Sequence, residues 1–233
     1  MALPEVPAML RTTRFLRSWF AVALAVLACV GLPVVINTMA QDREEAVDFA
    51  HPTRHFRVPN PARLSDADAL SIYDRIRDDM VAAYRLSQDP VADRYYTWRR
   101  HNRVPYLSAN HGDRYISNYA NAGASTYGQG AGPMPAGAVL AKDSFTVTRR
   151  GDVFTGPLFL MEKMPSGFSA ETRDWRDTMI MPDGSLFGTT TGEGSERVEF
   201  CVTCHATAGD SADHLFFVPE KFRLRFLQLE TND

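Results

Sequence analysis

Two cysteines and a histidine stand together near the end of the chain, in the sequence FCVTCHA of residues 200–206. Cys201 and Cys204 are separated by two residues, and His205 follows directly. This C-x-x-C-H spacing is typical of covalent attachment of a c-type haem, because one turn of backbone presents two thiols to the porphyrin vinyl groups and the next residue turns its imidazole toward the iron. We therefore predict one haem c, tethered by both cysteines, with His205 as the proximal iron ligand.

Three other interpretations of the cysteine pair are weaker but stay open at the level of sequence. A structural zinc site needs four ligands, and the third cysteine, Cys29, lies in a distant apolar run. A thioredoxin-like motif should follow a strand early in a βαβ unit, whereas only a short tail follows His205. A disulfide between such close neighbours leaves the histidine without a role.

The first part of the chain has the pattern of a membrane anchor or an export signal. Three arginines precede an unbroken apolar run of 18 residues, 19–36, and the acidic sequence QDREE follows. About 20 apolar residues span a bilayer, and the arginine-rich side is expected to stay in the cytoplasm. We predict a cytoplasmic segment at 1–18, a transmembrane anchor at 19–36 and a C-terminal domain in the periplasm of a bacterium, held at the inner membrane. Cleavage before Gln41 and lipidation of Cys29 are the alternatives.

Composition and charge limit the partners of this chain. It has 233 residues, of which 45% are hydrophobic and 23% charged, and its net charge of −3 gives no basic footprint for nucleic acid. The expected partners are a small ligand and, through the N-terminal helix, the membrane. Ala21, Ala25 and Ala28 form a small-residue face of the kind that packs helices in lipid, which is compatible with a membrane complex or a homodimer.

The stretch from Ser65 to Pro90, far before the cysteine motif, has the pattern of a helix. Residues 37–64 are polar and proline-dotted, and we expect a tether. Ser65 and Asp68 then occupy the positions of a capping box. Apolar residues follow at helical spacing until a proline stops the pattern, and they are Leu70, Tyr73, Ile76, Met80 and Tyr84 before Pro90. We assign residues 65–103 to a helical N-terminal extension.

From residue 104 onward the sequence predicts an antiparallel sheet. Short apolar runs at 137–147, 156–164 and 177–181 are separated by turn sequences such as RRGD and PDG. The fold class expected for the whole chain is α+β, with a mostly antiparallel β-sheet, flanking helices and one preceding transmembrane helix.

The residues available to the other face of the iron are few. The chain after His205 contains no methionine, and His214 is too near in sequence to reach the opposite face. The four methionines of the strand-like segments are better explained as core residues, and they are Met161, Met164, Met179 and Met181. We therefore predict an iron with an open distal side that binds a small molecule. A four-helix cytochrome c′ is disfavoured because the stretch before the motif is strand-like.

Six segments in a fixed order between residues 104 and 222 resemble the cytochrome P-460 family, which includes the β-type cytochromes c′. They are RYISNYAN, MPAGAVLAKDSF, LFLMEKM, DWRDTM, FCVTCH and DHLFF. The resemblance implies a haem c domain at 104–233 with a mostly antiparallel sheet. It also implies a bond from a strand lysine of the pattern G-x-V-x-x-K to the haem edge, which matches GAVLAK at Lys142. Composition alone favours a solvent-facing role for that lysine.

The same resemblance places a pocket arginine just before the first matched strand, at Arg114. His111 is either a second pocket group or a surface histidine, and we favour the surface. Glu199 is the nearest candidate for a distal carboxylate, chosen only for its closeness to the motif. The implied activity is oxidation of hydroxylamine, with Lys142 altering the macrocycle and Arg114 orienting the bound nitrogen species. Non-catalytic binding of nitric oxide and electron transfer within a larger membrane complex are the alternatives.

Overall fold

A computed structural model describes residues 52, 54–129 and 132–224. The predicted cytoplasmic segment at 1–18 and the predicted anchor at 19–36 lie outside these residues. Within the described part of the chain, no helix has the length and apolar character needed to cross a membrane.

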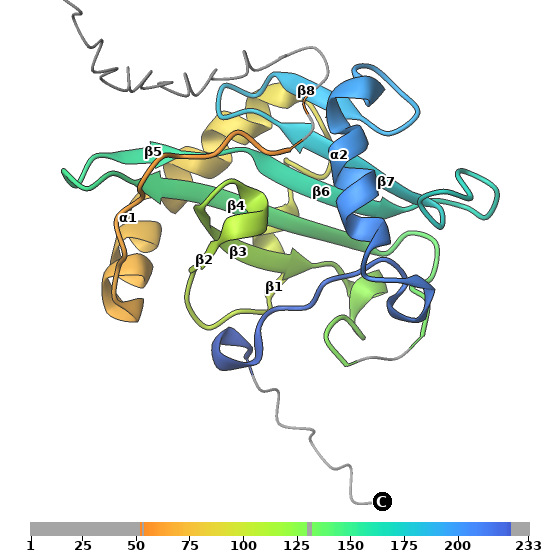
Figure 1. The fold of residues 1–233 in the computed structure, drawn as a ribbon, viewed down its shortest axis with the longest axis horizontal. Coiled ribbons are helices and arrows are strands. Elements are labelled where there is room, and N and C mark those ends of the chain that lie inside the picture. The colour runs from red at the N-terminus through yellow and green to blue at the C-terminus, as the bar shows by residue number, and fades with distance from the viewer. Residues whose placement is uncertain (1–51, 53, 130–131, 225–233) are drawn as a thin grey trace, which may run out of the picture. The chain divides into compact units, whose positions relative to one another are not determined.

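An eight-stranded sheet organises the described residues, and its strands pair antiparallel throughout (Figure 1). The order is β1-β3-β4-β6-β7-β8, while β2 also pairs with β3 and β5 with β4. The predicted α+β class with a mostly antiparallel sheet is thereby confirmed. The strands are β1 (Arg99–Arg100), β2 (Tyr106–Ser108), β3 (Arg114–Ala120), β4 (Val139–Val147), β5 (Val153–Thr155), β6 (Leu158–Lys163), β7 (Trp175–Ile180) and β8 (Leu186–Thr189).

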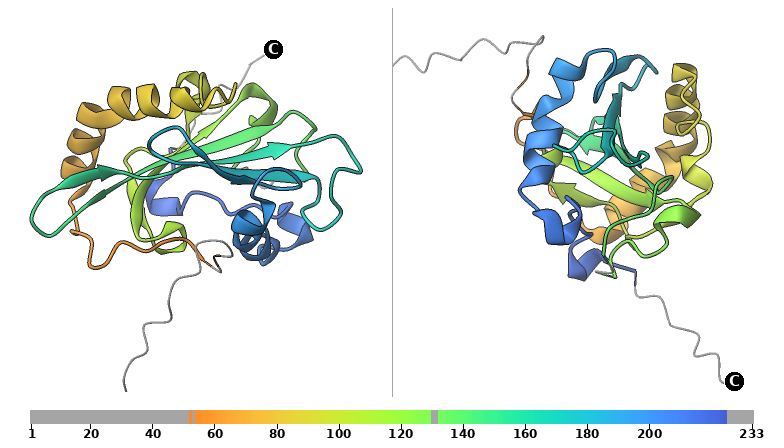
Figure 2. Two further views of the ribbon diagram at one scale, coloured as in Figure 1. Left: turned by 90° about the horizontal axis from the view of Figure 1, so that it is seen from above. Right: turned by 90° about the vertical axis from the view of Figure 1, so that its right-hand side faces the viewer.

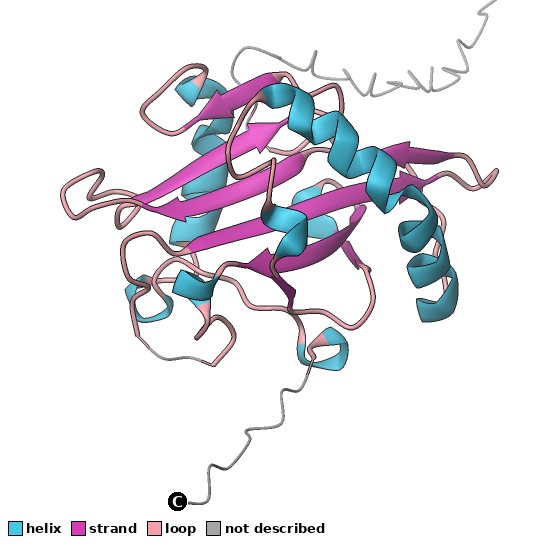
Figure 3. Ribbon diagram, turned by 180° about the vertical axis from the view of Figure 1, so that it is seen from behind, coloured by secondary structure: helices cyan, strands magenta, loops and turns pink. Residues whose placement is uncertain are grey.

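Two α-helices cover opposite faces of this sheet, as the turned views in Figure 2 show and as Figure 3 shows from behind. They are α1 (Asp66–Tyr84) and α2 (Ser195–Ala206). Because both faces are covered, all nine residues of the central strand β4 are buried. Successive side chains of a strand point to opposite faces, so β4 sends alternate residues toward α1 and toward α2.

Helix α1 forms where the sequence predicts it. The Ser65 hydroxyl accepts a hydrogen bond from the Asp68 backbone N–H at 3.1 Å, which confirms the N-terminal cap. Tyr73, Met80 and Tyr84 of the predicted stripe are buried, while Leu70 and Ile76 are only half-buried. The helix ends earlier than Pro90 indicates.

Residues 85–103 differ from the predicted helical extension. They contain two three-residue 3-10 turns, Arg85–Ser87 and Tyr95–Thr97, and then strand β1, which pairs with β3. The helix is interrupted at Gln88, which adopts the left-handed conformation with φ 61°. Arg99 and Arg100 therefore belong to the same sheet as the segment after residue 104.

A buried carboxylate lies between the sheet and α1. Asp143 of β4 is 1% exposed and accepts hydrogen bonds from the hydroxyls of Tyr73 at 2.6 Å and Tyr95 at 3.2 Å. The hydroxyls of Tyr73 and Tyr119 also hydrogen-bond to one another. Burial raises the pKa of Asp143 to about 7, although the bonds from Tyr73 and Tyr95 oppose the shift. Folding therefore favours the protonated form of Asp143 relative to the unfolded chain.

We expect Asp143→Asn to reduce the pH dependence of stability. Asparagine keeps an oxygen that accepts from both tyrosines, but it does not ionise. Since the pKa of Asp143 rises from 3.8 to about 7 on folding, the wild type should lose stability relative to the variant as the pH rises through that window. The slope should be about 1.4 kcal/mol per pH unit.

Urea unfolding of both proteins at pH 5 and pH 7 measures this difference. The control is Asp79→Asn, which removes an exposed carboxylate of α1. Parallel changes in stability for the wild type and Asp143→Asn between the two pH values would contradict the prediction.

Candidate functional site

Helix α2 is positioned by a close approach to strand β8. It begins after Gly194, which has φ 64°, and a Cβ on Gly188 of β8 would come within 2.2 Å of the Gly194 carbonyl oxygen. Only glycine allows the two backbones to lie so close. Val198 of α2 then packs against Phe159 and Met179 of the sheet. This packing aims the second half of the helix along the face that carries Lys142.

The two motif cysteines lie in the last two turns of α2. Both are free thiols, with Cys201 half-buried and Cys204 exposed, so no disulfide joins them. Burial raises the pKa of the Cys201 thiol well above its usual value, and the nearby Asp177 carboxylate adds to this shift. A redox dithiol has the opposite environment, a helix N-terminus that lowers the thiol pKa. Among the described residues, no group of three or more His, Cys, Asp or Glu side chains is arranged to hold a metal ion.

His205 at the end of α2 is held in one orientation. Its Nδ1 lies 2.9 Å from the backbone carbonyl oxygen of His214, which accepts only, so Nδ1 carries the proton. Burial, with a smaller contribution from the charge of Lys142, lowers the pKa of His205 to about 3. The neutral ring therefore keeps its lone pair on Nε2, the arrangement found in metal-ligating histidines.

The segment that orients His205 is fixed by a buried ion pair. Asp213 is 1% exposed and lies 2.7 Å from the Lys163 ammonium, which is 10% exposed. Its second oxygen accepts from the Met134 backbone N–H at 2.9 Å, and its carbonyl accepts from the Trp175 indole at 2.9 Å. These contacts tie the chain just before His214 to the sheet.

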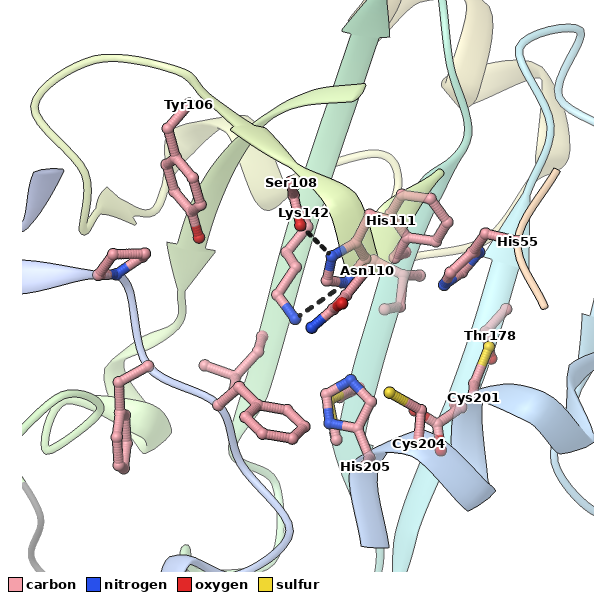
Figure 4. A pocket seen from close by; sticks show the side chains of 18 residues that line it. His55, Tyr106, Ser108, Asn110, His111, Lys142, Thr178, Cys201, Cys204 and His205 are labelled. Carbon is pink, nitrogen blue, oxygen red and sulfur yellow. Dashed lines mark hydrogen bonds between the residues drawn. The ribbon is translucent and has the colours of Figure 1, made fainter. Parts of the chain in front are cut away.

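A cavity of about 220 Å³ separates the end of α2 from the sheet. Figure 4 shows Cys204 and His205 on one side of it and His111, Asn110 and Lys142 on the opposite side. Much of the lining is apolar and comes from β4, β6 and the chain after α2, namely Leu140, Phe159, Leu160, Met161, Phe216, Phe217 and Pro219.

Three ionisable groups face this cavity from the sheet side. Lys142 is 7% exposed, and burial lowers its pKa to about 8 while the Asp177 carboxylate opposes the shift. Burial raises the pKa of Asp177 to about 7. His111 lies with Nε2 3.5 Å from the Lys142 ammonium and Nδ1 2.8 Å from the Ser108 hydroxyl. The favoured surface role for His111 is therefore wrong, and so is a solvent-facing Lys142.

Two other predicted residues do not line the cavity. Arg114 directs its Nη1 at the backbone carbonyl oxygen of Phe56, 2.7 Å away, so its guanidinium is engaged outside the cavity. Glu199 is exposed and lines a different surface hollow. The buried carboxylate at the site is Asp177, which sequence reasoning missed although it lies in the matched segment DWRDTM. His55 was also missed, because it belongs to the predicted tether yet lines the cavity.

The predicted core role is confirmed for two of the four methionines, and His214 lies on the side of His205, as its position in the sequence indicates. Met161 and Met179 are buried in the core, and Met164 and Met181 are half-buried. His214 follows α2 on the same side as His205, with its ring Nε2 3.2 Å from Asp210. A comparison with models of known protein families gives no match, and a comparison with curated proteins gives none either.

We expect Asp213→Ala to destabilise the fold by about 3–5 kcal/mol, because it leaves the Lys163 ammonium buried without its carboxylate. Asp210→Ala is the matched control, since Asp210 is 78% exposed and its removal should cost no more than about 0.5 kcal/mol. Urea unfolding of the two variants tests the contrast. Equal unfolding midpoints would show that the Lys163–Asp213 pair does not fix this segment.

Proposed function

We propose that this chain is a mono-haem c protein with an open distal iron site, of the type that the cytochrome P-460 resemblance implies. The observation that carries the proposal is the state of His205, a neutral imidazole whose Nδ1–H is tied to a backbone carbonyl and whose Nε2 is free at a cavity. The donor set fits the group, because two free thiols one helical turn apart stand beside that imidazole.

Cys201 and Cys204 would hold the haem through thioether bonds, and His205 would supply the proximal ligand. A haem held there would supply redox chemistry and a binding position for a small nitrogen oxide. The apolar lining from β4, β6 and the chain after α2 would pack against the haem. Lys142, which is the lysine of the matched G-x-V-x-x-K pattern, points into the same cavity and would form the additional bond to the haem edge.

The side of the cavity opposite His205 favours turnover over simple capture. Asp177, with a pKa near 7, exchanges protons close to neutral pH, and the lowered pKa of Lys142, near 8, leaves more of it as the neutral amine that a bond to the haem edge requires. Such groups suit the oxidation of hydroxylamine, in which protons leave with the electrons. We therefore favour a nitrogen-oxide oxidoreductase, attached to the bacterial inner membrane by the segment 19–36 and facing the periplasm. Its electrons would pass to a membrane partner.

We expect the haem to be covalent. Acid–acetone extraction of the wild type should leave the colour with the protein, and Cys201→Ala or Cys204→Ala should weaken the attachment. His205→Ala should keep the tethers but change the spectrum, because it removes the proximal ligand. Cys29→Ala is the control and should retain the haem. Transfer of the wild-type haem to the organic phase, or purification without iron, would refute the proposal.

We expect Lys142→Leu to return the reduced spectrum to that of an ordinary haem c. A bond from the lysine perturbs the conjugated ring, so the wild-type Soret band should lie further to the red and the intact mass should be lower by the hydrogens lost on bond formation. Lys142→Arg keeps a positive charge without the amine and should behave like Lys142→Leu. If both variants keep the wild-type spectrum, there is no cross-link, and nitric oxide binding or electron transfer becomes the better hypothesis.

A further inference from the structure

The cavity adjoins an outer groove on the surface of the described part of the chain. The groove is lined by residues of the segment 54–58, of the loop before β3 and of α2. Three residues line both the groove and the cavity, and they are His55, Asn110 and Cys204. Asn110 and Cys204 are exposed, whereas His55 is half-buried. His55 is thus the least exposed of the three, and Figure 4 shows it at one end of the cavity.

The His55 ring is held by contacts with three other rings. It stacks on His111 with centroids 5.4 Å apart, and it meets Phe159 at 4.9 Å and Phe200 at 4.6 Å edge to face. These partners come from the loop before β3, from β6 and from α2. The ring therefore fills the space between the sheet and α2 at one end of the cavity. Burial lowers the pKa of His55 to about 3, so it remains a neutral ring there.

Arg114 fixes the backbone that carries this ring. Its Nη1 lies 2.7 Å from the carbonyl oxygen of Phe56, the residue after His55, and 3.2 Å from that of His111. The Val58 backbone N–H donates to the Gly112 carbonyl oxygen at 3.1 Å. Gly112 has φ 75°, and a Cβ there would come within 2.4 Å of the Phe56 oxygen. The segment 54–58 and the loop before β3 therefore pack closely together around the Arg114 guanidinium.

We propose that His55 is a gate between the outer groove and the inner cavity, and that Arg114 is the positioning residue that holds the gate in place. The segment 54–58 thus admits small ligands to the cavity and delays larger ones. The role of Arg114 is to act through His55 rather than to touch the ligand. The first test below, which measures ligand association, rests on the proposed haem. The second test, which measures thiol reactivity, does not.

The first test follows ligand entry in the haem-loaded protein. Carbon monoxide and n-butyl isocyanide are mixed with the reduced wild type and His55→Ala, and their association rates are measured. His55→Ala should accelerate the isocyanide several-fold more than carbon monoxide, because opening the gate relieves the larger ligand most. Arg114→Gln should produce the same selective acceleration, and the double variant should add little to either. A merely structural role for Arg114 would lower the melting temperature without changing the ratio of the two rates.

The second test needs no haem and uses the two motif thiols. In protein that carries no haem, N-ethylmaleimide should modify Cys201 of the inner cavity several-fold faster in His55→Ala than in the wild type. The exposed Cys204 should react at an unchanged rate and serves as the internal control. Arg63→Ala is the control variant, since this exposed residue follows the segment 54–58 in the chain and lines neither hollow.

The outcomes separate the gate from the haem proposal. If the protein contains haem and His55→Ala leaves the ratio of ligand rates unchanged, the gate is overturned while the haem remains. If the protein contains no haem, the proposed function fails and the thiol rates decide the gate alone. Equal reactivity of Cys201 in the wild type and His55→Ala then overturns it.

Discussion

The site depends on the burial of strand β4 on both of its faces. Lys142 and Asp143 are neighbours in this strand, so their side chains must point to opposite sides of the sheet, and both are buried. Burying an ionisable group is costly unless the surroundings offer partners or shift its pKa. The protein meets this constraint differently on each side. Asp143 accepts hydrogen bonds from tyrosines of the α1 side, whereas Lys142 faces a cavity with Asp177 and His111.

The motif at the end of α2 acquires its geometry from the chain that follows it. A C-x-x-C-H sequence sets the spacing of two thiols and an imidazole, but it does not decide which ring nitrogen carries the proton. The His214 carbonyl oxygen decides this for His205, and the Asp213–Lys163 pair fixes the segment that leads to that carbonyl. Asp213 and His214 both have φ values above 50°, in a region that Asp and His enter more readily than most residues. The orientation of the candidate ligand is thus built from contacts distant in sequence.

Local patterns in the sequence predicted the elements but not their contacts. The cap at Ser65, the α1 stripe and the strands β4, β6 and β7 depend on residues close in the chain, and the structure confirms them. The burial of Lys142 depends on α2 lying across its face of the sheet, and no local sequence pattern indicates this packing. His55 and Arg114 illustrate the limit further. A polar, proline-dotted segment predicts a tether, yet one backbone carbonyl accepting from Arg114 brings His55 to the cavity.

The side chains that line the cavity help to discriminate between nitric oxide capture and catalytic turnover. Capture of neutral nitric oxide requires an iron and an apolar space. Burying a lysine, an aspartate and a histidine costs desolvation free energy without helping to bind this ligand. Here burial pushes the pKa of Lys142 down and that of Asp177 up, until both lie near neutrality in one cavity. Buried groups with perturbed pKa values cluster at functional sites, and a pKa near the operating pH, such as that of Asp177, suits proton transfer. Under the proposed function, proton-coupled turnover would give these buried groups a role, whereas capture of nitric oxide alone would not.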